Sequence, residues 1–334
     1  MARFEDRGPR VPISQATRVD KVHPRARTVR VVVALVSVIM ALIMLLPVGV
    51  MVISAMKTRS DVMSAPPKVL FKPTLEGFML LLTDRAVPNQ ARLDELTQNA
   101  KTGKLGLFAR IALDAGMEIT GPSNYVNRLR NSVIIAGTST ITSVLLGLFA
   151  AYAFSRFAIK GKNDLLFFIL STRMLPAVVV TIPLFLMYRQ LGLHDKHLGM
   201  IILYTVFNLS FSVWLLKGFI DEIPREYEEA ALVDGYTRMQ AFFRIVLPQA
   251  VSGIAATTVF CLIFAWNEYA FALMLTSERA RTAPPSIATM LGSGGLEWSA
   301  IAAGSLGFLI PVVIVTFALR KYLLRGITFG AIRG

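Results

Sequence analysis

Long apolar stretches, separated by short polar segments, dominate the pattern of this chain. Runs of this kind lie at 31–56, 131–154, 165–187, 198–218, 249–275 and 299–320. An α-helix rises about 1.5 Å per residue, so each run is long enough to cross a hydrocarbon core of about 30 Å. The pattern therefore predicts an all-α integral membrane protein with six transmembrane helices.

The polar segments between these runs suggest how the chain is divided. The expected parts are a basic N-terminal segment (1–30), a first transmembrane helix (31–56), an external loop (57–130), a core of five further helices (131–320) that contains a polar loop (219–248), and a C-terminal tail (321–334). We treat the apolar run at 31–56 as a retained anchor, because it is too long for the apolar region of a signal peptide.

Lysine and arginine indicate the orientation. The segments 1–30, 155–164, 217–248 and 320–334 together hold 19 Lys and Arg, whereas the short loops on the opposite side hold two each. Short loops rich in these residues stay in the cytoplasm, and loops longer than about 60 residues, such as 57–130, cross regardless of their charge. We therefore expect both termini and loop 219–248 in the cytoplasm, and loop 57–130 in the periplasm.

Composition agrees with a membrane protein. Hydrophobic residues make up 54% of the chain and charged residues 17%, below the roughly 25% of soluble domains. The net charge of +14 comes from basic residues between the apolar runs, with no stripe along a groove, so we expect no nucleic-acid partner. Cys261, the single cysteine, excludes an intrachain disulfide.

Motifs for catalysis and metal binding are missing from the sequence. It has no phosphate-binding GxxxxGK[ST] loop, so any ATP hydrolysis must belong to a partner subunit, and we expect no cofactor on this chain. His194 and His197 stand three positions apart on a short polar loop without a second cluster, which favours solvated side chains over a metal site. We expect neither a catalytic nor a metal-binding residue.

The polar loop 219–248 reads as a helix, a tight turn and a second helix. Pro224 suits a first helical turn that Asp221 or Glu222 would cap, and Gly235 suits the left-handed conformation that ends a helix. Thr237 followed by Gln240 has the form of a capping box, and the second helix would end or bend at Pro248. Small residues at Ala230 and Ala231 leave one face of the first helix open to a close approach.

Within this loop the chain resembles a known family. The residues Glu229-Ala230-Ala231, Gly235 and Ile245-Val246-Leu247-Pro248 match the EAA---G---------I-LP loop of permease subunits in bacterial ATP-driven (ABC) importers. The resemblance implies that this loop is a coupling helix that docks onto a cytoplasmic ATPase, with Glu229, Ala230, Ala231, Asp234 and Gly235 at the contact. A membrane-surface elbow, whose glycine and prolines only turn the chain, is the structural alternative.

Two further segments resemble maltose-type, carbohydrate-importing permeases. The C-terminal tail from Arg325 to Gly334 is similar to a glycine-rich ending that reaches the ATPase pair, which implies contacts at Gly330 and Gly334. The loop 276–298 matches in position a loop that such permeases push into the binding protein. The resemblance implies a type I ABC importer permease fold, and it covers nearly the whole chain except 1–30 and an insertion at about 84–123.

That insertion interrupts the external loop. Leu93, Leu96, Leu105, Phe108 and Ile111 recur there with approximate helical spacing, which predicts a small helical periplasmic cap. The insertion could either contact a binding protein or only stabilise the fold, and the sequence leaves both roles open.

Polar residues within the apolar runs are the candidates for the substrate pathway. Arg173 lies in the third run, and Asn267 and Glu268 lie near the outer end of the fifth, in a Trp-Asn-Glu-aromatic pattern that resembles carbohydrate importers. The alternative is that each charge satisfies a partner within the helix bundle. Pro176 and Pro183 are expected to break the third helix, and glycines suit close helix packing at Gly137, Gly147, Gly304 and Gly307.

Together these features predict a multi-pass permease of the bacterial inner membrane. The resemblance implies that it translocates a sugar or polyol from a periplasmic binding protein, and that it pairs with a second permease and two ATPase subunits that hold ATP and Mg. Transport of a phosphorylated polyol or a sulfosugar is an alternative. An ion-coupled secondary transporter is less favoured, because Glu268 is the single candidate for a chain of intramembrane carboxylates. Besides these proteins and the solute, we expect the chain to contact membrane lipid.

Overall fold

A computed structural model describes residues 24–292 and 295–331 of the 334-residue chain. The chain divides into two units, one ending at Val50 and the other running from Met51 onward. In its described part the first unit is the greater part of helix α1 (Pro24–Ala55), which is apolar along most of its length and contains Pro47. Expectations for residues 1–23 and for Gly334 lie outside the described residues.

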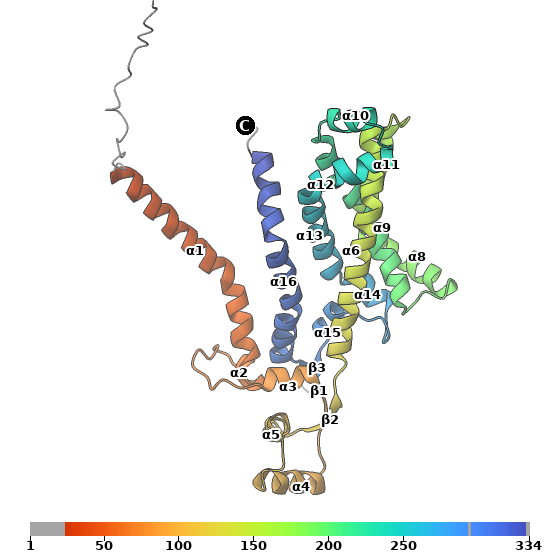
Figure 1. The fold of residues 1–334 in the computed structure, drawn as a ribbon. Helices are drawn as coiled ribbons and strands as arrows, with labels where there is room; N and C mark the ends of the chain where they lie inside the picture. Colours follow the sequence, from red (N-terminus) through yellow and green to blue (C-terminus); the bar gives the residue numbers. More distant parts are fainter. Residues whose placement is uncertain (1–23, 293–294, 332–334) are drawn as a thin grey trace, which may run out of the picture. The chain divides into compact units, whose positions relative to one another are not determined.

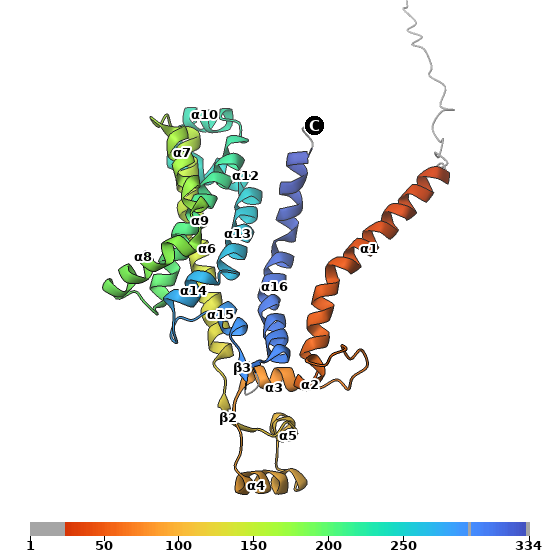
Figure 2. The same ribbon diagram turned by 180° about the vertical axis from the view of Figure 1, so that it is seen from behind.

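The second unit is a bundle of helices with short elements at both ends (Figures 1 and 2). Its main helices are α6 (Tyr125–Arg156), α7 (Lys162–Ser171), α8 (Ala177–Gln190), α9 (His197–Asp221), α13 (Val251–Trp266) and α16 (Trp298–Ala331). Its short elements are α2 (Arg59–Val62), α3 (Glu76–Leu82), α10 (Glu226–Val233), α11 (Arg238–Ala241), α12 (Leu247–Gln249), α14 (Ala270–Leu275), α15 (Ala283–Ala288) and the ribbon β3 (Leu291–Gly292) with β4 (Gly295–Leu296).

The predicted all-α class and its six spans are confirmed, with a difference in two of the spans. Among the described residues, four helices are long and apolar enough to cross a membrane, namely those containing 29–55, 125–156, 197–221 and 298–321. Two bent pairs raise this number to six if each pair counts as one span. The third and fifth spans are thus broken, and both breaks bear on the candidate site.

The third span bends where its sequence turns polar. Helix α7 passes through a 3-10 turn at Thr172–Met174 and meets α8 at an angle of 92°. Pro176 stands directly before α8, where its missing N–H costs no helical hydrogen bond. The expectation that Pro183 also breaks the helix is wrong, because Pro183 lies inside a continuous α8.

The fifth span is broken at two places. A π-helical turn, Phe242–Val246, precedes Pro248, and the following helix α13 turns by 73° from this segment. Helix α13 then ends at Trp266, and α14 begins only at Ala270. The continuous helix expected over 249–275 is therefore wrong at its outer end. The side chain of Asn267 donates to the carbonyl of Ile263 (2.9 Å), where it helps to end α13.

Close packing of α6 on α9 forms the centre of the bundle. A Cβ atom at Gly147 would lie 2.5 Å from Cβ of Ser212, so only glycine allows this approach. A Cβ at Gly307 would lie 2.7 Å from the Tyr125 hydroxyl, and one at Gly304 would lie 3.0 Å from Leu81. The close packing expected at these glycines is confirmed, whereas a Cβ at Gly137 would meet nothing within 4 Å.

The insertion is a helical arm on a two-stranded stalk. Strands β1 (Thr83–Ala86) and β2 (Glu118–Pro122) pair antiparallel, and α4 (Gln90–Lys101) and α5 (Leu107–Asp114) lie between them in the chain. The expected helices are present, but the periodicity of the leucines gave no sign of the ribbon. Helix α5 packs against α3 and α16 through a cluster of Met79, Leu80, Ala112 and Ala300. In both views the arm lies at the opposite end of the second unit from α10 (Figures 1 and 2).

Candidate functional site

The loop between α9 and the fifth span has the predicted helix, turn and second helix. Helix α10 ends before Gly235, whose φ of 89° is the left-handed conformation that glycine adopts freely. The Thr237 hydroxyl accepts from the Gln240 N–H, and the Gln240 side chain accepts from the Thr237 N–H, which completes the expected capping box. The expected cap at the start of α10 is wrong: Arg225 occupies that position, because Asp221 ends α9 and pairs with Lys217.

One face of α10 is free within this chain. Glu229, Ala230, Asp234 and Gly235 are exposed, and Val233 next to them is 87% exposed. The side chain of Ala231, by contrast, is buried against the chain's own elements, with 6% of its surface exposed. A partner on the free face would therefore touch Glu229 and Ala230 but not the methyl group of Ala231.

The opposite face of α10 is fixed to the end of α6 by a buried ion pair. Arg156 and Glu228 pair with side chains that are 5% and 8% exposed, and the Tyr152 hydroxyl donates to the same carboxylate (3.0 Å). Arg156 also donates to the carbonyl of Ile223 (3.0 Å), and Arg225 donates to that of Ser155 (2.8 Å). A buried charge is tolerated when it is paired and hydrogen-bonded, as here. We call these contacts the α6–α10 brace.

Sequence reasoning missed the brace. Glu228 is one of four glutamates between 222 and 229, and neither their spacing nor the apolar pattern separates it from its neighbours. Its partner is 72 positions away, at the end of a different helix. An arginine at the end of an apolar run, followed later by an acidic cluster, is too common a signal to identify such a pair.

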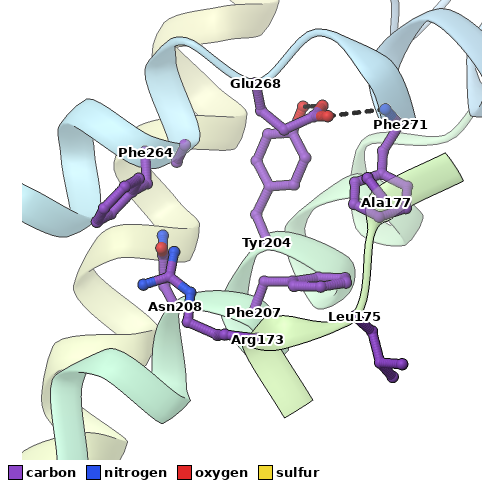
Figure 3. A pocket seen from close by; sticks show the side chains of 10 residues that line it. Arg173, Leu175, Ala177, Tyr204, Phe207, Asn208, Phe264, Glu268 and Phe271 are labelled. Atoms are coloured by element: carbon purple, nitrogen blue, oxygen red, sulfur yellow. Dashed lines mark hydrogen bonds between the residues drawn. The ribbon is translucent and has the colours of Figure 1, made fainter. Parts of the chain in front are cut away.

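The breaks in the third and fifth spans bring Arg173 and Glu268 to one cavity. This central cavity has a volume of about 320 Å³ and is lined by Arg173, Leu175, Ala177, Tyr204, Phe207, Asn208, Phe264, Ala265, Glu268 and Phe271 (Figure 3). Arg173 comes from the turn between α7 and α8, and Glu268 from the gap between α13 and α14. Tyr204 and Asn208 lie one turn apart on α9, a pairing that the sequence analysis did not single out.

Glu268 is fully engaged by its own surroundings. Its carboxylate accepts from the Tyr204 hydroxyl (2.6 Å) and from the backbone N–H groups of Phe271 (2.7 Å) and Ala272 (3.0 Å). These N–H groups belong to the first turn of α14, where a negative charge is favourable. Glu268 therefore caps α14 at the break in the fifth span. Its charge is satisfied by partners within the helix bundle, which is the alternative given above for the intramembrane charges.

Arg173 differs from Glu268 in its contacts. The central carbon of its guanidinium group lies 4.3 Å from the ring centre of Phe264 and 5.3 Å from that of Phe211, both cation–π contacts. Within the described residues it forms no ion pair or side-chain hydrogen bond, so its N–H groups remain for another acceptor. Asn267 does not line the cavity, so of the three expected pathway residues only Arg173 and Glu268 lie together.

The loop that contains the two histidines has a structural role. The Asp195 carboxylate accepts four backbone N–H groups, from Ser277 (2.9 Å), Glu278 (3.2 Å), Arg279 (3.1 Å) and Ala280 (3.1 Å). Partial burial works to raise the pKa of Asp195, but the four hydrogen bonds outweigh it, so the pKa lies below its ordinary value. Asp195 thereby fixes the loop between α14 and α15.

His197 takes part in the same region. Its Nε2 lies 2.7 Å from the side-chain oxygen of Asn131, whose amide donates to the carbonyls of Arg279 and Arg281. No group of three or more His, Cys, Asp or Glu that would suit a metal ion occurs among the described residues. At the other end of the chain, Gly330 falls in the last turn of α16, and its expected contact stays a prediction.

Comparisons with known proteins identify the class. Residues 143–329 match the family model for the binding-protein-dependent transport system inner membrane component. The trehalose transport system permease protein SugB of Mycobacterium tuberculosis is 35% identical over 71% of this chain and 88% of that protein. The trehalose/maltose transport system permease protein MalG of Thermococcus litoralis is 35% identical over 62% of this chain and 75% of that protein.

A solved structure has the same fold. One chain of a bacterial ABC transporter involved in the import of the acidic polysaccharide alginate covers 90% of this chain with a TM-score of 0.61, at 21% identity and 98% coverage of that chain. The protein is thus a membrane permease of the type I ABC importer fold. It belongs to the family of binding-protein-dependent inner membrane transport components. In this family the permease is not catalytic, and the ATPase is a separate subunit.

Proposed function

We propose that this chain is one of two permease subunits in an ATP-driven importer that moves a sugar or polyol from a periplasmic binding protein into the cytoplasm. ATP and Mg would be held by two ATPase subunits, and the second permease would be a homologue of this chain. The supporting observation is the geometry of α10, which has one face free and the other fixed to α6.

The free face is the proposed contact with an ATPase subunit. Glu229 and Ala230 present a charge and a small side chain there, and Asp234 and Gly235 extend the face past the end of the helix. An ATPase that closes on ATP would move α10, and the α6–α10 brace would pass this movement to α6. Because α6 packs along α9 and α9 lines the central cavity, the movement would reach the solute path. The cytoplasmic position of α10 is part of the proposal.

The central cavity is the proposed solute-binding site on this subunit. Phenylalanine rings at 207, 264 and 271 offer apolar faces for the C–H surface of a sugar ring, and Arg173 offers donors to its hydroxyl oxygens. Glu268 is already engaged and has a supporting role. The second permease would complete the site.

Co-purification and ATP hydrolysis test the proposal together. The chain is co-expressed with a homologous permease and ATPase subunits from the same organism, and the complex is reconstituted with a periplasmic binding protein from that organism. We expect ATP hydrolysis that rises several-fold when the binding protein is loaded with the sugar that stabilises it thermally. A permease that purifies without ATPase subunits, or hydrolysis indifferent to the loaded binding protein, would contradict the proposal.

A further inference from the structure

A second cavity lies outside the site described above, between α7 and α9. It has a volume of about 470 Å³ and is lined by Asn163, Leu166, Phe167, Leu170, Trp214, Lys217 and Gly218. We call it the α7–α9 groove. Helix α7 begins shortly after Arg156, so the groove lies at the end of the second unit that carries α10 (Figure 2).

The groove is polar at its end and apolar along its walls. Leu166, Leu170 and the exposed rings of Phe167 and Trp214 form the walls, while Asn163 and Lys217 stand at the end toward α10. Tryptophan is enriched where a membrane meets water, because its ring is apolar and its N–H is polar. The groove therefore has the same polarity as a phospholipid. Its polar end suits the headgroup, and its apolar walls suit the acyl chains.

The charges at this end favour an anionic headgroup. Lys217 pairs with Asp221, and Lys162 acts electrostatically on the same carboxylate. The loop before α7 adds Lys160, and Asp164 follows Lys162 on the exposed side, so three lysines face two aspartates. Among the described contacts Lys162 has no ion pair of its own. Basic pockets between transmembrane helices on the cytoplasmic side bind anionic headgroups, and each lysine near the surface contributes about 1 kcal/mol.

A second protein chain fits the groove less well. Helices that pack together within a membrane do so through small residues that let their backbones approach. The walls here are large side chains, and the one small residue, Gly218, faces open space, because a Cβ atom there would meet nothing within 4 Å. We propose that the α7–α9 groove is a binding site for an anionic phospholipid, with one acyl chain along Phe167 and Trp214 and its phosphate at Lys162, Asn163 and Lys217.

Two test substitutions and one control separate the contribution of the apolar walls from that of the charge. Gly218→Leu adds bulk inside the groove, where a Cβ atom at this position would meet nothing within 4 Å. Val206→Phe is the control, because it adds bulk at an exposed position of the same helix outside the groove. Lys162→Gln removes the unpaired cation from an accessible position and leaves the apolar walls intact. It also keeps the proposal testable if Gly218→Leu does not fold.

The experiment counts lipids on the purified permease–ATPase complex by native mass spectrometry. The complex is exchanged into mixed micelles of phosphatidylglycerol and phosphatidylcholine with the same acyl chains. We expect the wild type and Val206→Phe to retain phosphatidylglycerol in preference to phosphatidylcholine, and Gly218→Leu to lose this retained lipid. Lys162→Gln should weaken the preference for phosphatidylglycerol about fivefold, the equivalent of about 1 kcal/mol.

Two outcomes would overturn the proposal. Equal retention of phosphatidylglycerol by the wild type, Gly218→Leu and Lys162→Gln would show that the groove binds no lipid of this class. Loss of the second permease from the Gly218→Leu complex, with Val206→Phe unaffected, would show that the groove is a subunit interface.

Discussion

Arg156 and Glu228, which are 72 positions apart, form a buried ion pair that joins the end of α6 to α10. The pair fixes one face of α10 while Glu229, the next residue, remains exposed on the other face. Adjacent glutamates thus have opposite surroundings. This difference separates a residue that holds α10 in place from one that is free to contact a partner.

We predict that Glu228→Gln and Glu229→Gln have different effects. Removing one partner of a buried ion pair typically costs about 3–5 kcal/mol, because the other charge is left buried. Glu228→Gln should therefore lower the thermal stability of the purified permease clearly, and Glu229→Gln should leave it unchanged while weakening co-purification of the ATPase. Equal stability of the two variants would contradict the role of the brace.

Substitutions around Gly235 test the free face of α10. A β-branched residue at a φ of 89° is strained by roughly 1–3 kcal/mol, so Gly235→Val should distort the turn, and Gly235→Ala should do so less. Ala230→Glu places a second carboxylate on the exposed face without strain in the fold. We expect both Gly235→Val and Ala230→Glu to insert and pair with the second permease but to lose ATPase co-purification or stimulated hydrolysis.

Ala231→Glu is the matched control for that experiment. Because the Ala231 side chain is buried within the chain, a glutamate there would disturb the packing of α10 itself. We expect Ala231→Glu to lower permease stability, in contrast to Ala230→Glu. Normal coupling in Ala230→Glu and Gly235→Val, measured as ATP hydrolysis in proteoliposomes, would contradict the proposed ATPase contact.

Within the central cavity, substitutions of Arg173 and Glu268 should have different effects on stability and on uptake. Glu268 caps α14 with three hydrogen bonds, so Glu268→Gln is expected to lower stability before it affects transport. Arg173 has only aromatic contacts within the described residues, so Arg173→Gln should keep the fold. Loss of a hydrogen bond from a charged donor to the solute costs about 1.5–3 kcal/mol, which corresponds to a roughly tenfold or greater fall in uptake.

Initial uptake rates in proteoliposomes with loaded binding protein, together with thermal unfolding, check this prediction. Phe264→Leu is a useful companion, because it removes the closest ring from Arg173 but keeps the charge. If Arg173→Gln unfolds while its uptake per folded molecule stays normal, Arg173 is a structural residue and the cavity is not the solute site.

The sequence predicted the parts of the fold that depend on periodicity and local turn chemistry. The apolar runs located every span, and Gly235, Thr237 and Gln240 located the turn and capping box after α10. Contacts between distant residues had no such signal. The pairing of Tyr204 with Glu268 and of Arg156 with Glu228 depends on how helices pack, and neither spacing nor composition encodes it.

The breaks in the spans show the same limit. Pro176 and Pro183 have similar surroundings in the sequence, yet only Pro176 stands at a break. The interruption between Trp266 and Ala270 falls within an apolar run, and its cause is a side chain, Glu268, that caps the next helix. Nothing in the sequence indicated that α10 packs the side chain of Ala231 against its own chain.

Asp195 gives a prediction for pH dependence. Its pKa is lowered in the folded protein, so its contribution to stability is present above its unfolded pKa of about 3.9 and is lost as pH falls through the lower folded value. Asp195→Asn should therefore reduce the protection of residues 277–280 from hydrogen exchange at neutral pH, and the difference from the wild type should shrink below about pH 4. His194→Gln, a change in the adjacent residue, is the control that should leave this protection intact.

The two helices of the inserted arm should differ in their tolerance of change. Helix α4 has no buried residue, and its ion pair from Arg92 to Glu118 is partly exposed, a type of contact worth about 0–1 kcal/mol. Helix α5 places Ala112, which is fully buried, against Met79 and Ala300. We predict that replacing residues 90–101 with a Gly-Ser linker preserves thermal stability and membrane insertion, whereas Ala112→Asp destabilises the permease by several kcal/mol, because a charge is buried without a partner.

Thermal unfolding and protease accessibility of the reconstituted permease measure both effects, with Asp114→Ala at the end of α5 as the tolerated control. Equal loss of stability in the linker variant and in Ala112→Asp would show that α4 is as much a part of the fold as α5. A linker variant that is stable but binds the periplasmic protein at least tenfold more weakly would instead identify α4 as a docking surface.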